Sequence, residues 1–214
     1  MKMKMAVSIL TVAQSLSPVL APAHDPVVPQ VAAKPQASAS GPRCSAIGAD
    51  ELTITCAFAA GSPVVAESRT APRIILNRAV ISFVPTNESN MSIQLTFTND
   101  SGGKIADQRT VYLAIDDEKG ENHMRRSLPH VDFTRLEPGR PTKFEEALLA
   151  PAFSPGAYNV AVWIPSTDPS LKFDPAHNFL LSSKGVPDRA TGLNRIAKFS
   201  VSASGRRKSA VPLY

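Results

Sequence analysis

The chain has 214 residues and a formal net charge of +5; 43% of its residues are hydrophobic and only 6% are aromatic. This length accommodates one ordinary domain with a tail at either end, and the hydrophobic content excludes a chain that is disordered throughout. Much of the positive charge lies near the two ends, in Lys2, Lys4 and residues 206–208. Because a nucleic-acid partner requires a basic patch on the folded face, we expect none.

Residues 1–23 contain the parts of a secretory signal in their usual order. Lys2 and Lys4 give a positive start, residues 6–20 are mostly apolar, and Ala21-Pro22-Ala23 offers small residues at a cleavage position. An uncleaved anchor and a soluble N-terminal helix are the alternatives. The apolar stretch is too short and too interrupted to span a bilayer well, so we predict cleavage and no transmembrane segment thereafter. The mature protein would then be secreted, or located in the periplasm or cell envelope.

The two cysteines, Cys44 and Cys56, are predicted to form a disulfide because an exported chain matures under oxidising conditions. The bridge would pin a hairpin within residues 43–66, and closing so short a loop stabilises the fold by about 3 kcal/mol. The preceding residues 24–42 are rich in proline, alanine and serine and are interpreted as a flexible linker. Residues 204–214 are interpreted as an exposed basic tail.

Residues 67–203 have the pattern of short strands separated by turns. Met91, Ile93, Leu95 and Phe97 alternate with polar residues, which is the period of a half-buried strand. Further strands are expected at 73–84, 110–115, 142–149, 157–164, 177–182 and 196–201, with a short helix as the alternative for 142–149. Prolines (19) outnumber glycines (11), which argues against long helices. The prediction is an all-β protein: an antiparallel, immunoglobulin-like β-sandwich of about seven strands.

A series of short motifs runs through the second half of the chain. It comprises Asp132-Phe133-Thr134-Arg135, Ser154-Pro155-Gly156-Ala157-Tyr158, Asp168-Pro169, Phe179-Leu180-Leu181 and Thr191-Gly192-Leu193-Asn194-Arg195. Over about residues 73–202 the series resembles the C-terminal β-rich module named domain of unknown function 4832. That module typically follows a barrel-like domain suggestive of glycoside hydrolases, so the resemblance implies an accessory part of sugar-active architectures. This sequence departs from the family pattern in that Leu181-Ser182-Ser183-Lys184 replaces the usual Ala-Asn. It also departs in that only a linker and a hairpin precede the module, so we do not expect it to inherit a hydrolase activity.

Two groups of polar residues are candidates for ligand binding. Asp168 and Asp174, with Asn178 close by, could offer oxygens to Ca²⁺, but Pro169 and Pro175 favour plain turn chemistry, and we expect no metal. Asp132 and Arg135 are close enough to form an ion pair that braces the connection before Pro138.

No catalytic constellation is recognisable. Asp132 with Asp168, or Asp116 with Glu145, could be nominated as paired acids, but no spacing selects either pair. The four histidines are scattered, and no cofactor is expected. Asn87, Asn90 and Asn99 begin glycosylation sequons, which matter only in a eukaryotic secretory pathway.

Trp163 is the one residue wide enough to act as a stacking platform for a sugar ring. It alternates with Val162 and Ile164, so it faces outward if the aliphatic residues form the core. A ligand or a covering loop could then lie against it. We therefore expect an exported, non-catalytic module that binds carbohydrate or serves glycan-active enzymes, with a polysaccharide or an envelope protein as partner. The alternative is a structural or protein-interaction domain of the cell envelope.

Overall fold

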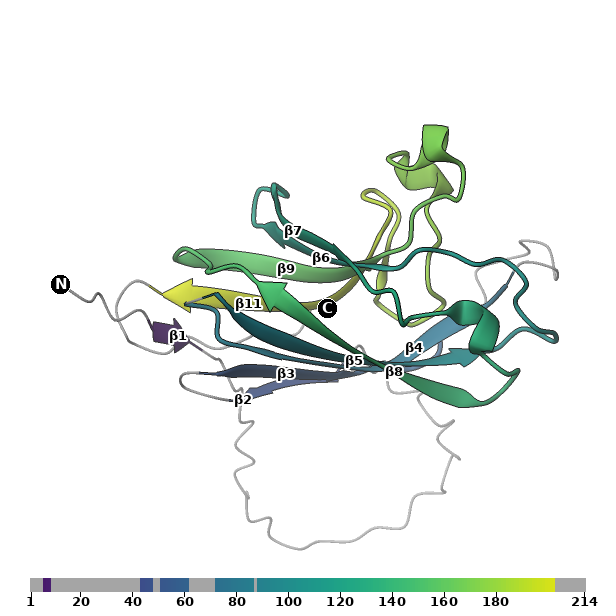
Figure 1. The fold of residues 1–214 in the computed structure, drawn as a ribbon, viewed down its shortest axis with the longest axis horizontal. Coiled ribbons are helices and arrows are strands. Elements are labelled where there is room, and N and C mark those ends of the chain that lie inside the picture. Colours follow the sequence, from purple (N-terminus) through teal and green to yellow (C-terminus); the bar gives the residue numbers. More distant parts are fainter. Residues whose placement is uncertain (1–5, 9–42, 48–50, 62–71, 87, 203–214) are drawn as a thin grey trace, which may run out of the picture.

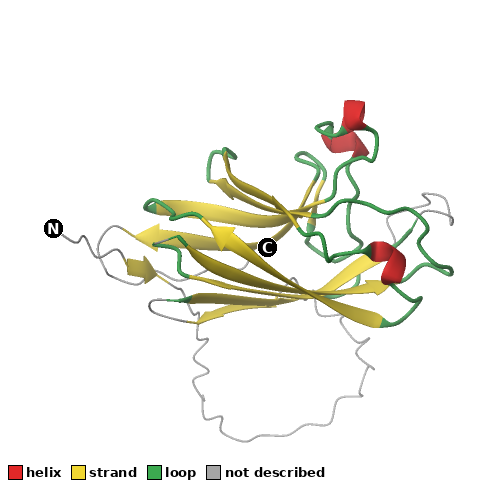
Figure 2. Ribbon diagram, in the orientation of Figure 1, coloured by secondary structure: helices red, strands yellow, loops and turns green. Residues whose placement is uncertain are grey.

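The computed structural model describes residues 6–8, 43–47, 51–61, 72–86 and 88–202. Two antiparallel sheets pack face to face, which confirms the predicted all-β sandwich (Figures 1 and 2). One sheet has the order β1 (Ala6–Ser8), β11 (Leu193–Ser202), β9 (Gly156–Trp163), β6 (Tyr112–Asp117) and β7 (Asn122–Ser127), with β10 (Pro187–Asp188) paired to β11. The other has the order β2 (Arg43–Ile47), β3 (Leu52–Ala57), β4 (Ile74–Phe83), β5 (Ser89–Asn99) and β8 (Pro141–Ala150).

The path of the chain between the sheets is immunoglobulin-like. After the β4–β5 hairpin the chain crosses to form β6 and β7, returns to place β8 beside β5, and crosses again to place β9 beside β6 and then β11 beside β9. The order β4-β5-β8 therefore faces the order β7-β6-β9-β11, as in immunoglobulin-like sandwiches.

The core lies between the sheets because both sheets turn their apolar rows inward. Met91, Ile93, Leu95 and Phe97 of β5 are all fully buried, as the alternation predicts. On the facing sheet Val160 and Val162 point into the same core. Towards one end of the core, Phe199 lies edge to face with Phe83 and with Phe153, and the Phe83 and Phe153 rings are tilted by 60°, with the three centroids 5.3–5.6 Å apart.

The start of β9 carries a tyrosine corner, a hallmark of this sandwich class. The Tyr158 hydroxyl donates a hydrogen bond to the Ser154 carbonyl oxygen over 2.9 Å. Burial and the charge of Asp117 raise the pKa of Tyr158, so the hydroxyl keeps its proton at neutral pH. The Ser154-to-Tyr158 motif therefore fixes the turn between β8 and β9.

The predicted disulfide joins Cys44 to Cys56 across directly paired positions of β2 and β3. β3 in turn pairs along β4, so the pinned hairpin is continuous with the sandwich and widens one of its sheets. The two strands that the disulfide joins are therefore part of the sandwich.

Sequence reasoning was wrong at one strand and missed two others, β7 and the two-residue β10. The strand expected at 177–182 is wrong: these residues form the end of the 3₁₀ helix η3 (Pro175–His177) and then an extended segment. The N–H groups of this segment donate to several separate strand ends, so it does not pair along any single strand. β7 escaped notice because Met124 is its only buried side chain. The ambiguous segment 142–149 is strand, within β8.

Several expectations concern residues outside the described ranges. They are the linker at 24–42, the basic tail at 204–214 and all of the signal peptide except Ala6–Ser8, which pairs with β11. Among the described residues, no helix has the length and apolar content needed to cross a bilayer.

Candidate binding surface

Long connections gather at one end of the sandwich (Figure 1). They are residues 100–111 after β5, residues 128–140 after β7, and residues 164–192 after β9. The connections contact one another: the Arg109 guanidinium lies 5.2 Å from the centroid of the Phe179 ring, and the Phe133 ring lies 6.4 Å from the same ring. In immunoglobulin-like sandwiches the loops after the corresponding strands form the recognition end. This end contains every residue that the sequence nominated for ligand binding.

The connection 164–192 is anchored by a buried amide. Asn194 is fully buried at the start of β11; its Oδ1 accepts from the Leu181 N–H over 2.7 Å, and its Nδ2 donates to the Phe179 carbonyl over 3.0 Å. The Phe179 N–H donates to the Ile164 carbonyl over 2.8 Å. Because a buried backbone group without a partner is costly, these bonds hold the extended segment against the end of the sheet.

Gly192 closes the turn before β11 by close contact. Its φ is +67°, and a Cβ there would lie 2.5 Å from Asn178 Nδ2 and 2.7 Å from Pro175 Cα. The half-buried Asn178 therefore packs against this glycine and helps to join η3 to the turn. Gly192 and Asn194 therefore both position the connection 164–192.

Asp168 and Asp174 shape the protruding part of the connection. Asp168 caps η2 (Pro169–Leu171) by accepting from the Ser170 N–H and hydroxyl, and Asp174 caps η3 by accepting from the Ala176 N–H over 3.0 Å. Hydrogen bonds from Ser170 lower the pKa of Asp168, and those from Ala176 and His177 lower the pKa of Asp174. These carboxylates are turn-forming groups. In the described ranges, no group of three or more His, Cys, Asp or Glu is placed to hold a metal ion.

Trp163 lies on the outer face of its sheet and is covered by this connection. Its ring is only 8% exposed, packs 5.0 Å from the Tyr112 ring and stacks under Phe173, with centroids 5.8 Å apart and planes 24° apart. Phe173 is 80% exposed. Lys172 Nζ lies 5.3 Å from the Tyr112 centroid, 5.9 Å from that of Trp163 and 5.8 Å from that of Phe173. We call Tyr112, Trp163, Lys172 and Phe173 the aromatic platform.

Asp132 and Arg135 lie on the neighbouring connection, and their predicted ion pair is wrong. Asp132 caps η1 (Phe133–Arg135) by accepting from the Thr134 N–H and hydroxyl. The Arg135 guanidinium instead lies 6.0 Å from the centroid of the Phe144 ring. Capping directs the carboxylate towards the backbone N–H, away from the arginine side chain.

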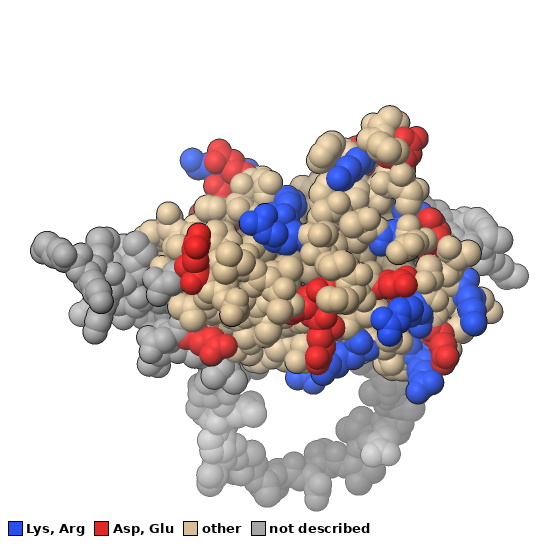
Figure 3. Space-filling model, viewed as in Figure 1, with Lys and Arg blue, Asp and Glu red and all other residues tan. Residues whose placement is uncertain are grey.

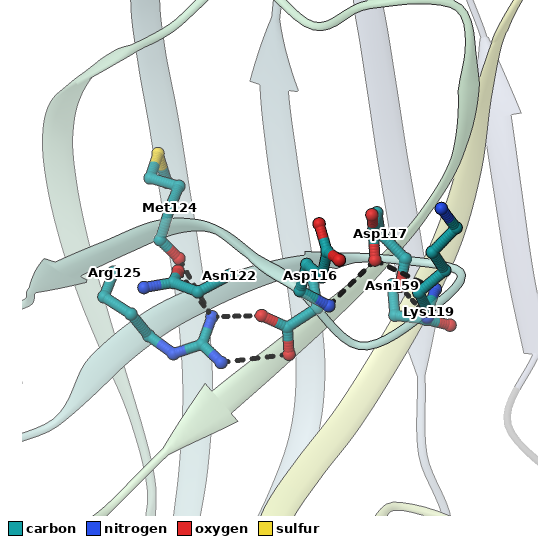
Figure 4. Close-up of polar contacts among 8 residues, drawn as sticks. Asp116, Asp117, Lys119, Asn122, Met124, Arg125 and Asn159 are labelled. Atoms are coloured by element: carbon teal, nitrogen blue, oxygen red, sulfur yellow. Dashed lines mark hydrogen bonds and ion pairs between the residues drawn. The ribbon is translucent and has the colours of Figure 1, made fainter.

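The nominated acid pairs are not assembled either. Asp116 of β6 forms a two-pronged ion pair with Arg125 of β7, over 2.5 and 3.0 Å, and the adjacent Asp117 accepts from the N–H groups of its own hairpin (Figure 4). Glu145 lies on β8 of the other sheet and pairs with Lys143. Asp132 and Asp168 cap separate 3₁₀ helices. Of the sequons, Asn99 is fully buried and donates to the carbonyls of Gly103 and Leu136, so it is not an acceptor for a glycan.

Sequence reasoning missed two features of this end. Phe173 and Lys172 were not nominated, although Phe173 is the only aromatic residue in the polar run 165–178. Glu146 was also overlooked: it points inward from the edge strand β8, is buried, and accepts from the His130 N–H and, over 2.8 Å, pairs with His130 Nδ1. The sequence did contain a signal for Glu146: it stands two positions after Phe144, so strand alternation places this acidic residue on the inward face of β8. This contact ties the connection 128–140 to β8.

Basic and acidic side chains are interspersed over the face drawn in Figure 3, with no extended field of one sign. Recognition on this face would therefore depend on local contacts rather than on a broad potential. No family model matches the chain, and no curated protein matches it.

Proposed function

We propose that this chain is an exported, non-catalytic β-sandwich module that binds carbohydrate through the aromatic platform. The observation that carries the proposal is Phe173, an 80% exposed ring held in a stack on Trp163. One face of this ring covers Trp163, and its other face is a flat apolar surface left in water on which a ligand can stack.

The setting of the ring supports this function in two ways. Asn194, Gly192 and the capping carboxylates hold the connection in place before any ligand arrives, which lowers the entropy lost on binding. Lys172, whose Nζ lies 5.8 Å from the centroid of the Phe173 ring, can donate to sugar hydroxyls. An apolar platform with a few polar groups is typical of small-ligand sites.

Export and an envelope location rest on the N-terminal pattern and on the disulfide. A Cys44–Cys56 bridge fits an oxidising compartment. The resemblance to a module of sugar-active architectures adds an argument by analogy.

The test is retention on a panel of polysaccharides, with Phe173→Ala compared with Leu149→Ala. Leu149 is 58% exposed on β8 and serves as a matched control, because both changes remove an exposed apolar side chain. We expect the Phe173 variant to bind at least about tenfold more weakly, equivalent to about 1.4 kcal/mol, and the Leu149 variant to bind as wild type. Absence of retention on every polysaccharide, or equal binding by the Phe173 variant, would refute the proposal.

A protein-interaction domain is the second candidate, and the edge strand β8 favours it. In the described part of the chain β8 pairs only with β5, so its other edge offers backbone groups to an added strand. This candidate predicts a crosslinked partner along β8, and capture of that partner would be unaffected by Phe173→Ala.

A further inference from the structure

The ammonium group of Lys172 lies among three aromatic rings. Neighbouring cations are paired with carboxylates: Arg109 with Asp107 and Arg195 with Asp188. Within the described ranges no carboxylate lies within ion-pair distance of Lys172. Its Nζ is instead placed by the Tyr112, Trp163 and Phe173 rings and donates to the Tyr112 hydroxyl over 3.4 Å.

This placement leaves the positive charge available to a ligand. Cation–π contact orients an ammonium group without neutralising it. Lys172 is half-buried, with its charge beside the exposed ring of Phe173, so a ligand stacked on that ring would lie near the cation. Asp168 and Asp174, the acidic residues on either side of Lys172 in the sequence, are already engaged, Asp168 with Ser170 and Asp174 with Ala176 and His177.

We infer that the ligand is an acidic polysaccharide whose sugar rings carry carboxylates, an inference that rests on the proposed function. One ring would stack on the outward face of Phe173, while its carboxylate would accept a charge-assisted hydrogen bond from Lys172 Nζ. Such bonds are about twice as strong as neutral ones, so charge would set the choice among glycans.

The experiment measures binding of the full chain to three uronate polymers, namely polygalacturonate, alginate and hyaluronate, each beside its methyl ester. Esterification removes the negative charge and keeps the ring. We expect at least one polymer to bind about tenfold more tightly than its ester, with the preference falling as salt rises. Lys172→Gln should abolish the preference, and Lys172→Arg should retain most of it. Lys119→Gln, the same charge change in the hairpin between β6 and β7, should leave it intact.

The outcomes separate the two proposals. Equal binding of every acid and its ester, or an unchanged preference in Lys172→Gln, overturns the inference, and retention that remains sensitive to Phe173→Ala leaves the proposed function standing. Tighter binding of dextran sulfate than of any uronate overturns the assignment of a carboxylate. Absence of binding to every glycan overturns both.

Discussion

Gly192 and Asn194 are single residues that determine the position of a long connection. Both fix the connection that carries Lys172 and Phe173 of the aromatic platform. The φ of +67° at Gly192 lies in the left-handed region, which glycine adopts without strain and which the turn before β11 requires. Gly192 packs against Asn178 and Pro175, which lie more than ten positions earlier in the chain. No local sequence pattern could predict this contact.

Substitution of Gly192 by alanine should therefore destabilise the fold. The Cβ would collide with Pro175 and Asn178 in addition to straining the backbone, and together these effects should cost about 1–3 kcal/mol in the free energy of unfolding, measured by urea denaturation. Gly139→Ala is the control, because Gly139 also has a positive φ (72°) but open space around it. Equal losses in the two variants would show that contact at Gly192 is unimportant.

At the scale of elements, the strands were predictable and the long connections were not. The alternation of apolar residues predicted β5 and β9, because residues such as Phe97 and Val160 point to the core face of their sheets and their sequence neighbours point to the other face. The segment 177–182 has a strand-like composition, but its N–H groups bond to Ile74, Ile164 and Asn194 on separate strands. The outward direction of Trp163 followed from alternation; its cover by Phe173 depends on these long-range bonds, which no local pattern contains.

The turn between β10 and β11 should make stability depend on acid. Burial raises the pKa of Asp188, but the Thr191 side chain, Arg195 and backbone N–H groups outweigh it, so the pKa is lowered from 3.8. A lowered pKa in the folded state gives stability that is present above pH 3.8 and is lost as the pH falls through the folded value.

Comparison of wild type with Asp188→Asn by urea denaturation tests this turn. The wild type should be more stable at about pH 6, and its advantage should shrink as the pH falls to about 3. Asp168 and Asp174, whose pKa values are also lowered, are present in both proteins and cancel in the difference. A difference that stays constant or grows in acid would contradict the assigned role of Asp188.

For the whole molecule, the immunoglobulin-like path gathers the connections 100–111, 128–140 and 164–192 at one end. The sandwich itself is stabilised by its core and by the Cys44–Cys56 bridge, leaving this end free to carry recognition. Composition and strand pattern predicted the fold class, because they report burial directly. Composition and strand pattern could not predict which residues of these three connections contact one another, because those contacts depend on which strands each connection joins across the two sheets.

The most direct measurement is a titration of isotope-labelled protein with oligosaccharides of the retained polymer, following each backbone amide by NMR. We predict that the largest amide chemical-shift changes fall within residues 165–178 and at Tyr112 and Trp163, and that these changes are lost in Phe173→Ala. Largest shifts along β8 or around the hairpin between β6 and β7, with the platform unmoved, would contradict it.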